Sequence, residues 1–233
     1  AFGSDGFTVG SETGVNANTE THVAWCWKES ATAGFDIVSY TGNATNRTIS
    51  HNLSAVPKMM IVRNLQGGYN WIVYHVGNGA GKYMYLDTDA SVYTGSGYFN
   101  DTAPTSSVFT VGTDAQVNTT SATIMAYVFA DVKGFSKFGT FKGNANANGP
   151  FVYTGFRPAR IMLKNTQDAS TWMIMDNKRS GYNPTNNRLY ANTQAVEESA
   201  VDRFDILSNG FKIRTTDADT NKSGDLFIYA AFA

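Results

Sequence analysis

The chain repeats itself about every 101 residues, and this internal repeat constrains its fold more than any other feature. Tyr40-Thr41-Gly42-Asn43 returns as Phe141-Lys142-Gly143-Asn144, 101 positions later. Repetition at a fixed period is the sequence signature of tandem structural units. We therefore predict a first unit at residues 34–133 and a second unit at residues 134–233. Further segments recur in the same order at offsets of 101 to 105: residues 56–62 with 157–163, 70–73 with 171–174, 85–90 with 190–195, 108–111 with 210–213, and 126–130 with 229–233.

Residues 1–33, the N-terminal arm, hold a third and partial copy. Residues 6–10 match 108–112, and residues 24–27 match 126–129, both at an offset of 102. The arm therefore reads as the closing hairpin of a partial preceding unit. Either a longer parent protein carries the missing part, or a neighbouring chain completes the unit by strand addition.

The composition favours an all-β fold, with each unit an antiparallel, jelly-roll-like β-sandwich. Charged residues make up only 16% of the 233 residues, whereas aromatic residues reach 13% and glycines number 22. Aromatic and β-branched side chains pack well on pleated sheets, and glycine accepts tight turns. We predict a hairpin from residues 58–63 and 71–74, and its repeat from 160–164 and 171–175. Helical periodicity is otherwise absent, and residues 194–201 are the one candidate for a short helical turn.

The closing strand of each unit is apolar on both faces. Alternate side chains of a strand point to opposite sides, so Trp25 and Trp27 face one way and Cys26 the other. A strand buried on both sides belongs at the centre of a sheet or under a domain interface. Cys26 is the only cysteine, which excludes an intrachain disulfide, and we expect it to be a small buried hydrophobe.

Charge and hydropathy exclude several classes of partner. The formal net charge is −1, so no basic field attracts nucleic acid. No apolar stretch approaches the roughly 18 residues of a membrane span, and we expect no membrane insertion.

Catalytic patterns are weak, and the sequence predicts neither an enzyme nor a bound cofactor. His22, His51 and His75 have no partners at metal-ligand spacing, and no Gly-x-Ser-x-Gly elbow is present. Carboxylate pairs of the kind that glycosidases use fit solvated turns better. These pairs are Asp87 with Asp89, Glu197 with Glu198, and Asp202 with Asp205.

One segment has oxygen ligands at the alternating positions that suit calcium. However, Lys222 stands where such loops carry glycine, and no glutamate closes the segment. A polar hairpin loop is therefore the favoured interpretation. The candidate ligands are Asp217, Asp219, Asn221 and Asp225.

Several runs together resemble a repeat module of uncharacterised structural proteins from marine bacteriophages, cyanophages especially, where it often follows a laminin-G or concanavalin-like sandwich. The resemblance covers nearly the whole chain and implies a virion structural or fibre component, without supplying a catalytic residue. The runs are residues 6–10, 23–28, 40–43, 51–62 and 151–158.

These observations predict a non-enzymatic protein at the virion surface or in the extracellular space. It would serve as a tail fibre, adhesin or capsid-attached fibre, giving a rigid spacer and contacting copies of itself, other virion proteins, and a host-surface glycan or protein. One alternative is the subunit of a cellular extracellular filament that assembles by strand complementation. Another is a carbohydrate-binding module, for which Tyr93, Tyr98 and Tyr182 could form an exposed platform.

Overall fold

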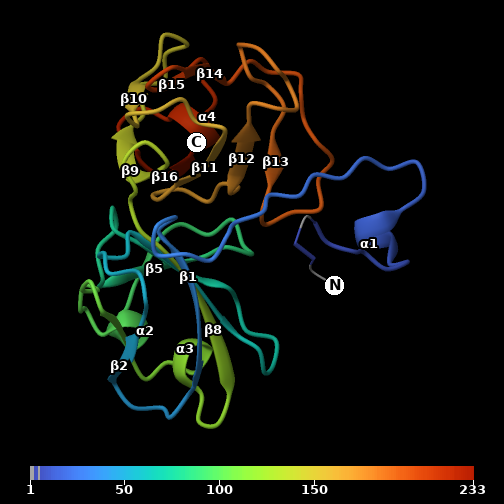
Figure 1. Ribbon diagram of the computed structural model, residues 1–233. Helices are drawn as coiled ribbons and strands as arrows, with labels where there is room; N and C mark the ends of the chain where they lie inside the picture. The colour runs from blue at the N-terminus through green and yellow to red at the C-terminus, as the bar shows by residue number, and fades with distance from the viewer. Residues whose placement is uncertain (1–2, 5) are drawn as a thin grey trace.

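The computed structural model describes residues 3–4 and 6–233, and these form two stacked β-rich lobes with a projecting arm (Figure 1). The lower lobe contains a six-stranded sheet and a two-stranded sheet, and every pairing within them is antiparallel. The large sheet runs in the order β1 (Phe35–Thr41), β8 (Thr123–Phe129), β3 (Met59–Asn64), β4 (Ile72–His75), β5 (Lys82–Tyr85) and β6 (Tyr93–Thr94), and the small one pairs β2 (Arg47–Ser50) with β7 (Val108–Val111).

The upper lobe has the same plan. A five-stranded and a three-stranded sheet are again antiparallel throughout, so the prediction of an all-β fold with sandwich character is confirmed. The large sheet runs β13 (Leu189–Tyr190), β12 (Met173–Asp176), β11 (Arg160–Asn165), β16 (Leu226–Phe232) and β9 (Ser136–Lys142), and the small one β10 (Phe151–Tyr153), β15 (Gly210–Ile213) and β14 (Phe204–Leu207).

The strands recur at the offsets of the sequence repeat. β9 begins 101 residues after β1, β15 begins 102 after β7, and β16 begins 103 after β8. The two predicted hairpins are present as β3 with β4 and β11 with β12. Equivalent sequence segments therefore occupy equivalent places in the two lobes.

The helices of the described residues are single four-residue turns, and none could cross a membrane. The candidate helical turn at residues 194–201 is not helical. This segment is irregular, and Glu198 within it forms an isolated β-bridge with Arg188. The turns are α1 (Thr13–Asn16), α2 (Ser96–Phe99), α3 (Ala115–Asn118) and α4 (Ala218–Asn221).

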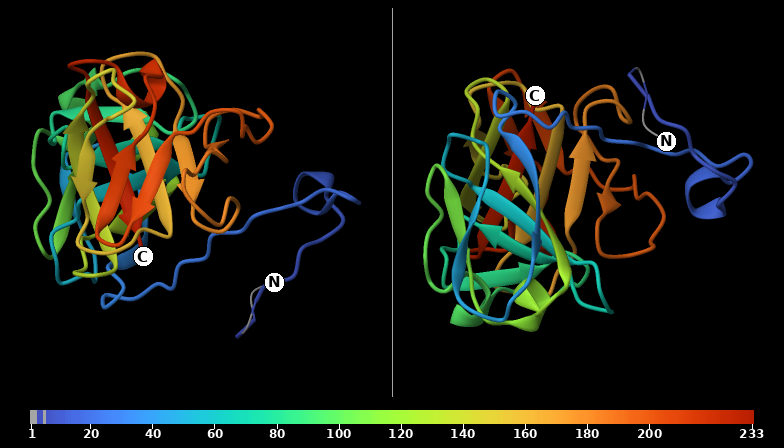
Figure 2. Two further views of the ribbon diagram at one scale, coloured as in Figure 1. Left: turned by 90° about the horizontal axis from the view of Figure 1, so that it is seen from above. Right: turned by 60° about the horizontal axis from the view of Figure 1, so that its bottom comes forward.

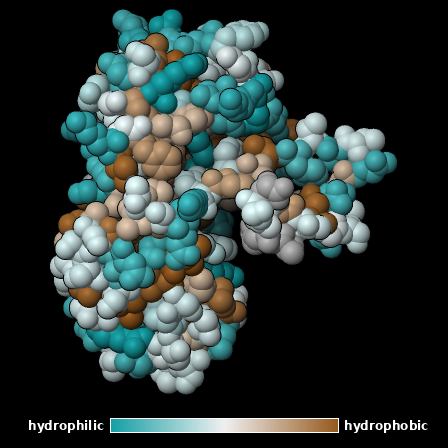
Figure 3. Space-filling model, in the orientation of Figure 1, coloured by the Kyte–Doolittle hydropathy of each residue, from teal (hydrophilic) through white to brown (hydrophobic). Residues whose placement is uncertain are grey.

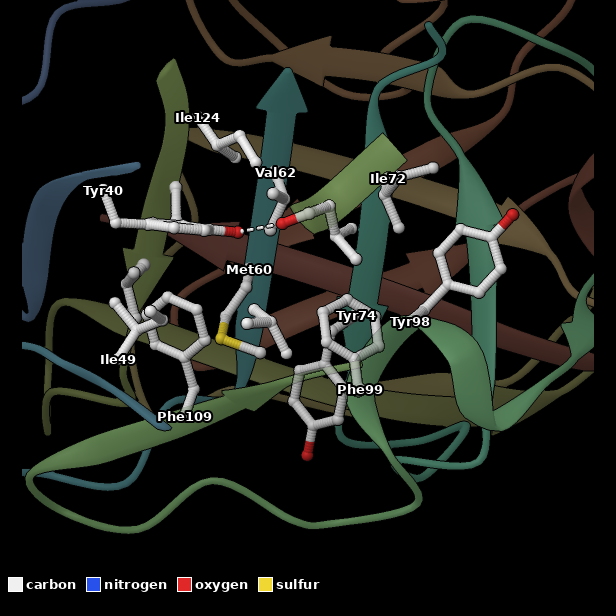
Figure 4. Close-up of a cluster of buried hydrophobic side chains, with 14 of the residues drawn as sticks. Tyr40, Ile49, Met60, Val62, Ile72, Tyr74, Tyr98, Phe99, Phe109 and Ile124 are labelled. Carbon is white, nitrogen blue, oxygen red and sulfur yellow. Dashed lines mark hydrogen bonds between the residues drawn. The ribbon is translucent and has the colours of Figure 1, made fainter. Parts of the chain in front are cut away.

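Each lobe encloses its own core between its large and small sheets. In the first unit, Ile49 and Phe109 from the small sheet meet Met60 and Ile124 from the large one (Figure 4). The Tyr40 hydroxyl is also buried here and donates a hydrogen bond to the Val117 carbonyl oxygen, at 2.7 Å. The second unit repeats this packing around its own phenylalanine-rich core.

A third hydrophobic cluster, the shared core, lies between the large sheets of the two units. The alternation of β16 shows the division clearly. Its residues 227, 229 and 231 enter the core of the second unit, whereas 228, 230 and 232 enter the shared core. Since β8 and β16 each lie inside a sheet and beside this interface, the prediction for the closing strands is confirmed for both. The members of the shared core include Phe35, Met59, Val73, Met84, Phe129, Phe138, Met162, Trp172, Ile174, Ile228, Ala230 and Phe232.

The N-terminal arm extends from the body toward α1, as all three ribbon views show (Figures 1 and 2). The predicted closing hairpin does not form within its described residues, because residues 17–29 run without ladder partners. Trp25 and Trp27 lie instead on the shared core, and the Arg160 guanidinium stacks over both rings at 4.9 and 4.8 Å. Cys26, on the opposite side of the segment, is exposed, so the expectation of a buried thiol is wrong for this chain.

Candidate functional site

A short turn with a fixed pattern occurs three times and marks the same point in each copy of the repeat. An acidic residue is followed four positions later by asparagine, and the residues between them form α1, α3 or α4. We call these the acidic–Asn turns, at residues 12–16, 114–118 and 217–221. In all three, the asparagine side-chain amide donates to the carbonyl oxygen six residues earlier, at 2.7 Å.

In the two complete units, the asparagine of this turn is buried. It hydrogen-bonds the residues that follow the first strand of its unit, β1 or β9. It thereby holds the opening part of the unit, which begins with that strand, against the closing part, which contains the turn and the last strand. Asn118 accepts a hydrogen bond from the Asn43 backbone N–H at 2.9 Å and donates to the Thr45 carbonyl at 2.7 Å. Asn221 does the same with the Asn144 N–H and the Asn146 carbonyl, both at 2.8 Å.

Gly42 and Gly143, which precede Asn43 and Asn144, allow the turn to approach this closely. A Cβ on Gly42 would lie 2.0 Å from the Thr119 carbonyl oxygen, and one on Gly143 would lie 2.2 Å from that of Lys222. Backbone atoms cannot yield at such distances, so the aromatic-x-Gly-Asn motif is shaped to receive the acidic–Asn turn.

Replacing Asn118 by alanine is expected to destabilise the protein by about 3 kcal/mol, because three partners lose hydrogen bonds and buried groups left unpaired cost about 1 kcal/mol or more each. Asn16 is exposed, so Asn16→Ala should change the free energy of unfolding by less than about 0.5 kcal/mol. Urea denaturation measures both values, and equal losses would contradict the role of the buried turn.

The arm displays side chains that the complete units bury. Phe7 is 47% exposed, Val9 40% and Val15 51%, whereas their counterparts 102 residues later in the first unit are all completely buried. Those counterparts are Phe109, Val111 and Val117. Figure 3 shows such hydrophobic atoms on the surface of the projecting arm. The arm thus presents one half of a unit core to solvent.

The candidate calcium ligands are not arranged around a cation. Asp217 accepts from the Asp219 N–H at 2.9 Å and pairs with Arg203 at 3.1 Å, while Asn221 is the buried turn residue. Asp225 accepts from the Asn165 amide at 2.9 Å. In the part of the chain that the structure describes, no three His, Cys, Asp or Glu side chains form a metal-binding group. The alternating oxygens of this segment instead build an acidic–Asn turn.

Two of the three tyrosines considered for a platform, Tyr93 and Tyr98, lie in one cluster, and Tyr182 lies outside it. Tyr98 is buried, and Tyr182 is 80% exposed, far outside the cluster in sequence. Tyr93 is 41% exposed and lies in a cluster with Tyr83 and Tyr85.

Within this cluster, the ring of Tyr83 stacks between two others, with centroid separations of 3.6 Å to Tyr98 and 5.5 Å to Tyr93. The Tyr98 hydroxyl accepts from the Gln116 amide at 2.7 Å and lies 3.4 Å from the Tyr85 hydroxyl. Burial and these neighbouring hydroxyls raise the pKa of Tyr98 above its ordinary value of 10, so it stays a neutral hydrogen-bonding group. The cluster offers an aromatic face with polar groups beside it.

The three histidines lie apart. His51 is buried beside the Thr105 carbonyl oxygen, at 3.2 Å, and His75 is buried at the interface between the units. His22 lines an open cleft of about 470 Å³ between the arm and residues 187–197, together with Glu20 and Arg179.

Four of the six carboxylates considered for glycosidase chemistry have structural partners for their side chains. Glu198 accepts from Arg188 and, at 2.8 Å, from the Tyr190 hydroxyl, and the hydrogen bond from Arg188 leads the effects that lower the pKa of Glu198. The buried Arg203 guanidinium lies 3.2 Å from Glu198 and 3.1 Å from Asp217, so it fastens the 191–203 loop to α4.

Two of the other carboxylates are also paired with arginines. Glu197 pairs with Arg179, and Asp205 lies 3.4 Å from Arg214. Asp87 accepts a hydrogen bond from the Trp71 N–H at 3.2 Å, and the Asp89 carbonyl binds the second unit. Asp202 is exposed.

Reasoning from sequence missed the acidic–Asn turns and the tyrosines Tyr83 and Tyr85. The signal for the turns was present, because the acidic residue and the asparagine recur at offsets of 102 and 103. No sequence signal identifies the tyrosine cluster, since it depends on how β5, β6 and α2 pack.

Comparison with known proteins locates the chain in one family and gives no functional precedent. No curated protein and no solved structure matches it. A domain of unknown function, DUF7483, matches over residues 1–233, a span that takes in the arm as well as both units. The chain therefore belongs to the DUF7483 family.

Proposed function

We propose that this protein is a non-enzymatic structural component of a phage virion, a tail fibre, adhesin or capsid-attached fibre, in which the two units act as one rigid spacer. The observation that carries the proposal is the shared core. Its apolar side chains come from the large sheets of both units and pack into a single cluster. A continuous apolar interface resists bending between units, unlike the polar interfaces of mobile domains.

Hydrogen bonds across the interface support the same role. The Trp172 indole N–H donates to the Tyr85 carbonyl oxygen at 2.7 Å, and the Ser170 N–H to that of Asp89 at 2.8 Å. Lys164, fully buried, also reaches the Asp89 carbonyl at 3.2 Å. Buried polar groups have defined partners, so these bonds favour one relative placement of the units.

The placement on a virion rests on the resemblance to repeat modules of marine phage structural proteins. The partners of this protein would be copies of the chain, other virion proteins and a host-surface glycan or protein.

Calorimetry tests the rigid spacer. We expect the 233-residue chain to unfold in a single transition whose calorimetric and van't Hoff enthalpies agree, because the shared core couples the units. Two separate transitions would contradict the proposal, since each unit would then unfold independently of its neighbour.

Carbohydrate binding is a second candidate function, favoured by the tyrosine cluster. Aromatic faces pack against sugar rings, and Tyr93 is the exposed member of the cluster. If the cluster is a glycan site, Tyr93→Ala should weaken binding at least about tenfold, the effect of losing roughly 1.4 kcal/mol. Glycan-array screening followed by titration measures this effect.

Tyr182→Ala is the matched control, because Tyr182 is a still more exposed tyrosine outside the cluster. It should leave glycan affinity unchanged. Equal effects of the two substitutions, or no glycan bound by the unaltered chain, would reject the carbohydrate hypothesis.

A further inference from the structure

Three aromatic residues at equivalent repeat positions meet at one point. Trp27, Phe129 and Phe232 each belong to the closing segment of a repeat copy, at offsets of 102 and 103. Their ring centroids are separated by 6.4, 5.5 and 6.0 Å, and their planes are inclined by 76°, 73° and 66°. The contacts are therefore nearly equal, and each ring meets the other two edge to face.

Such an aromatic triangle is what three equivalent closing strands would form around an approximate threefold axis. Two of its members, Phe129 and Phe232, lie on β8 and β16, each inside a large sheet. The third, Trp27, has the same position in the arm, and no strand of the described residues pairs with its segment. The arm thus brings a third closing segment to the shared core.

The side chains on the opposite face of that segment occupy positions that are in the unit core in a complete unit. Ala24 and Cys26 are exposed, whereas their counterparts Ala126 and Val128 are completely buried in the first unit. Phe7, Val9 and Val15 share this property, as described above.

The arm also has the local structure of a closing part. α1 lies 102 residues before α3, and the Asn16 N–H bonds to the Glu12 carbonyl at 3.0 Å, as Asn118 does with Asp114 at 2.9 Å. The Asn16 side chain donates to the Gly10 carbonyl oxygen, but among the residues that the structure describes it holds no aromatic-x-Gly-Asn segment of the kind that Asn118 and Asn221 hold.

We propose that the arm is the docking surface for a third opening part, a segment of the same kind as residues 34–105 carried ahead of the arm on the same polypeptide. Its aromatic-x-Gly-Asn turn binds Asn16, its strands flank residues 21–27, and the completed body has three large sheets around the aromatic triangle. A second copy of this chain is a poorer occupant, because its own opening parts are already closed by α3 with β8 and by α4 with β16.

Cys26 provides the test, because it is the only thiol and occupies the position of the buried Val128. An extended chain is made in which residues 34–105 are placed directly before Ser4, which adds no cysteine. We expect its reaction with Ellman's reagent to be at least about 100-fold slower than that of the 233-residue chain. A rate within twofold of the shorter chain overturns the proposal, whether or not the added segment folds.

The matched control carries Gly42→Val in the added copy alone. This variant keeps the length but puts a Cβ where the backbone of the turn must approach, and it should restore the fast reaction. Protection that persists in the control would overturn the proposed docking mode. Thiol protection in the 233-residue chain that increases with protein concentration would also overturn it, in favour of a second copy as occupant.

Docking of a third opening part on the arm does not require that the protein be a virion component. Only the biological purpose of this docking rests on the function proposed above. The thiol experiment can fail while calorimetry still shows one cooperative body, and two calorimetric transitions leave the thiol result unaffected.

Discussion

Replacing Trp172 by alanine is expected to destabilise the protein by about 3–5 kcal/mol, the range for removing a large aromatic side chain from a packed core. Trp172 is only 1% exposed, and its ring lies in the shared core between the two large sheets. Its indole N–H also donates across the interface to the Tyr85 carbonyl oxygen, which would lose this partner. The substitution should therefore weaken the junction more than either unit.

Trp71→Ala is the control within the same molecule, because Trp71 is the repeat counterpart of Trp172. It is only partly buried, stacks on Tyr127 at 6.2 Å and lies beneath the Arg63 guanidinium at 5.5 Å. We expect a loss of about 1 kcal/mol, typical of a partly exposed position.

Calorimetry of both variants measures the difference. Trp172→Ala should lower the melting temperature more and separate the single transition into two. Equal effects of the two substitutions would show that the junction does not depend on the buried tryptophan.

The layout of the fold could be predicted from the sequence because the duplication repeats the sequence pattern of the main strands in both units. The pairs β1 with β9 and β8 with β16 could be placed from matching segments alone, and their apolar pattern placed the closing strands at an interface. How the two units meet could not be predicted, because Trp71 and Trp172 match in sequence yet differ in burial. The difference arises from the way the large sheets face each other, which no local pattern records.

The candidate site, too, could be predicted from the sequence only in part. The acidic–Asn turn was visible as a recurring pattern, but spaced oxygens are shared by calcium loops and capped turns. Only the partners of Asn221 distinguish the two. Cys26 appeared buried because hydrophobic flanks predict a core strand, and such a strand is buried only where a sheet surrounds it.

His75 makes the junction between the units sensitive to acid. It is 1% exposed on β4, and both ring nitrogens are engaged. Nε2 donates to the Tyr229 carbonyl oxygen of the second unit at 3.1 Å, and Nδ1 accepts from the Gly77 N–H at the same distance. A second ring proton would point at the Gly77 N–H, so this arrangement requires the neutral imidazole.

Burial lowers the pKa of His75 from 6.5 to about 4, with the Tyr229 carbonyl and the charge of Asp131 opposing the shift. The unfolded chain therefore takes up a proton at a pH where the folded protein does not. The stability contributed by the neutral His75 is complete above pH 6.5 and is lost as the pH falls toward 4.

We expect this loss to be about 3 kcal/mol, because each unit of pKa difference is worth about 1.4 kcal/mol. Carboxylates also titrate over this range, so the variant His75→Gln is the reference; its amide can still donate to the Tyr229 carbonyl but takes up no proton. Urea denaturation at pH 7 and pH 4.5 should show a larger fall in the free energy of unfolding for the unaltered protein than for the variant. Parallel falls in the two proteins would mean that the buried imidazole does not govern the acid sensitivity of the junction.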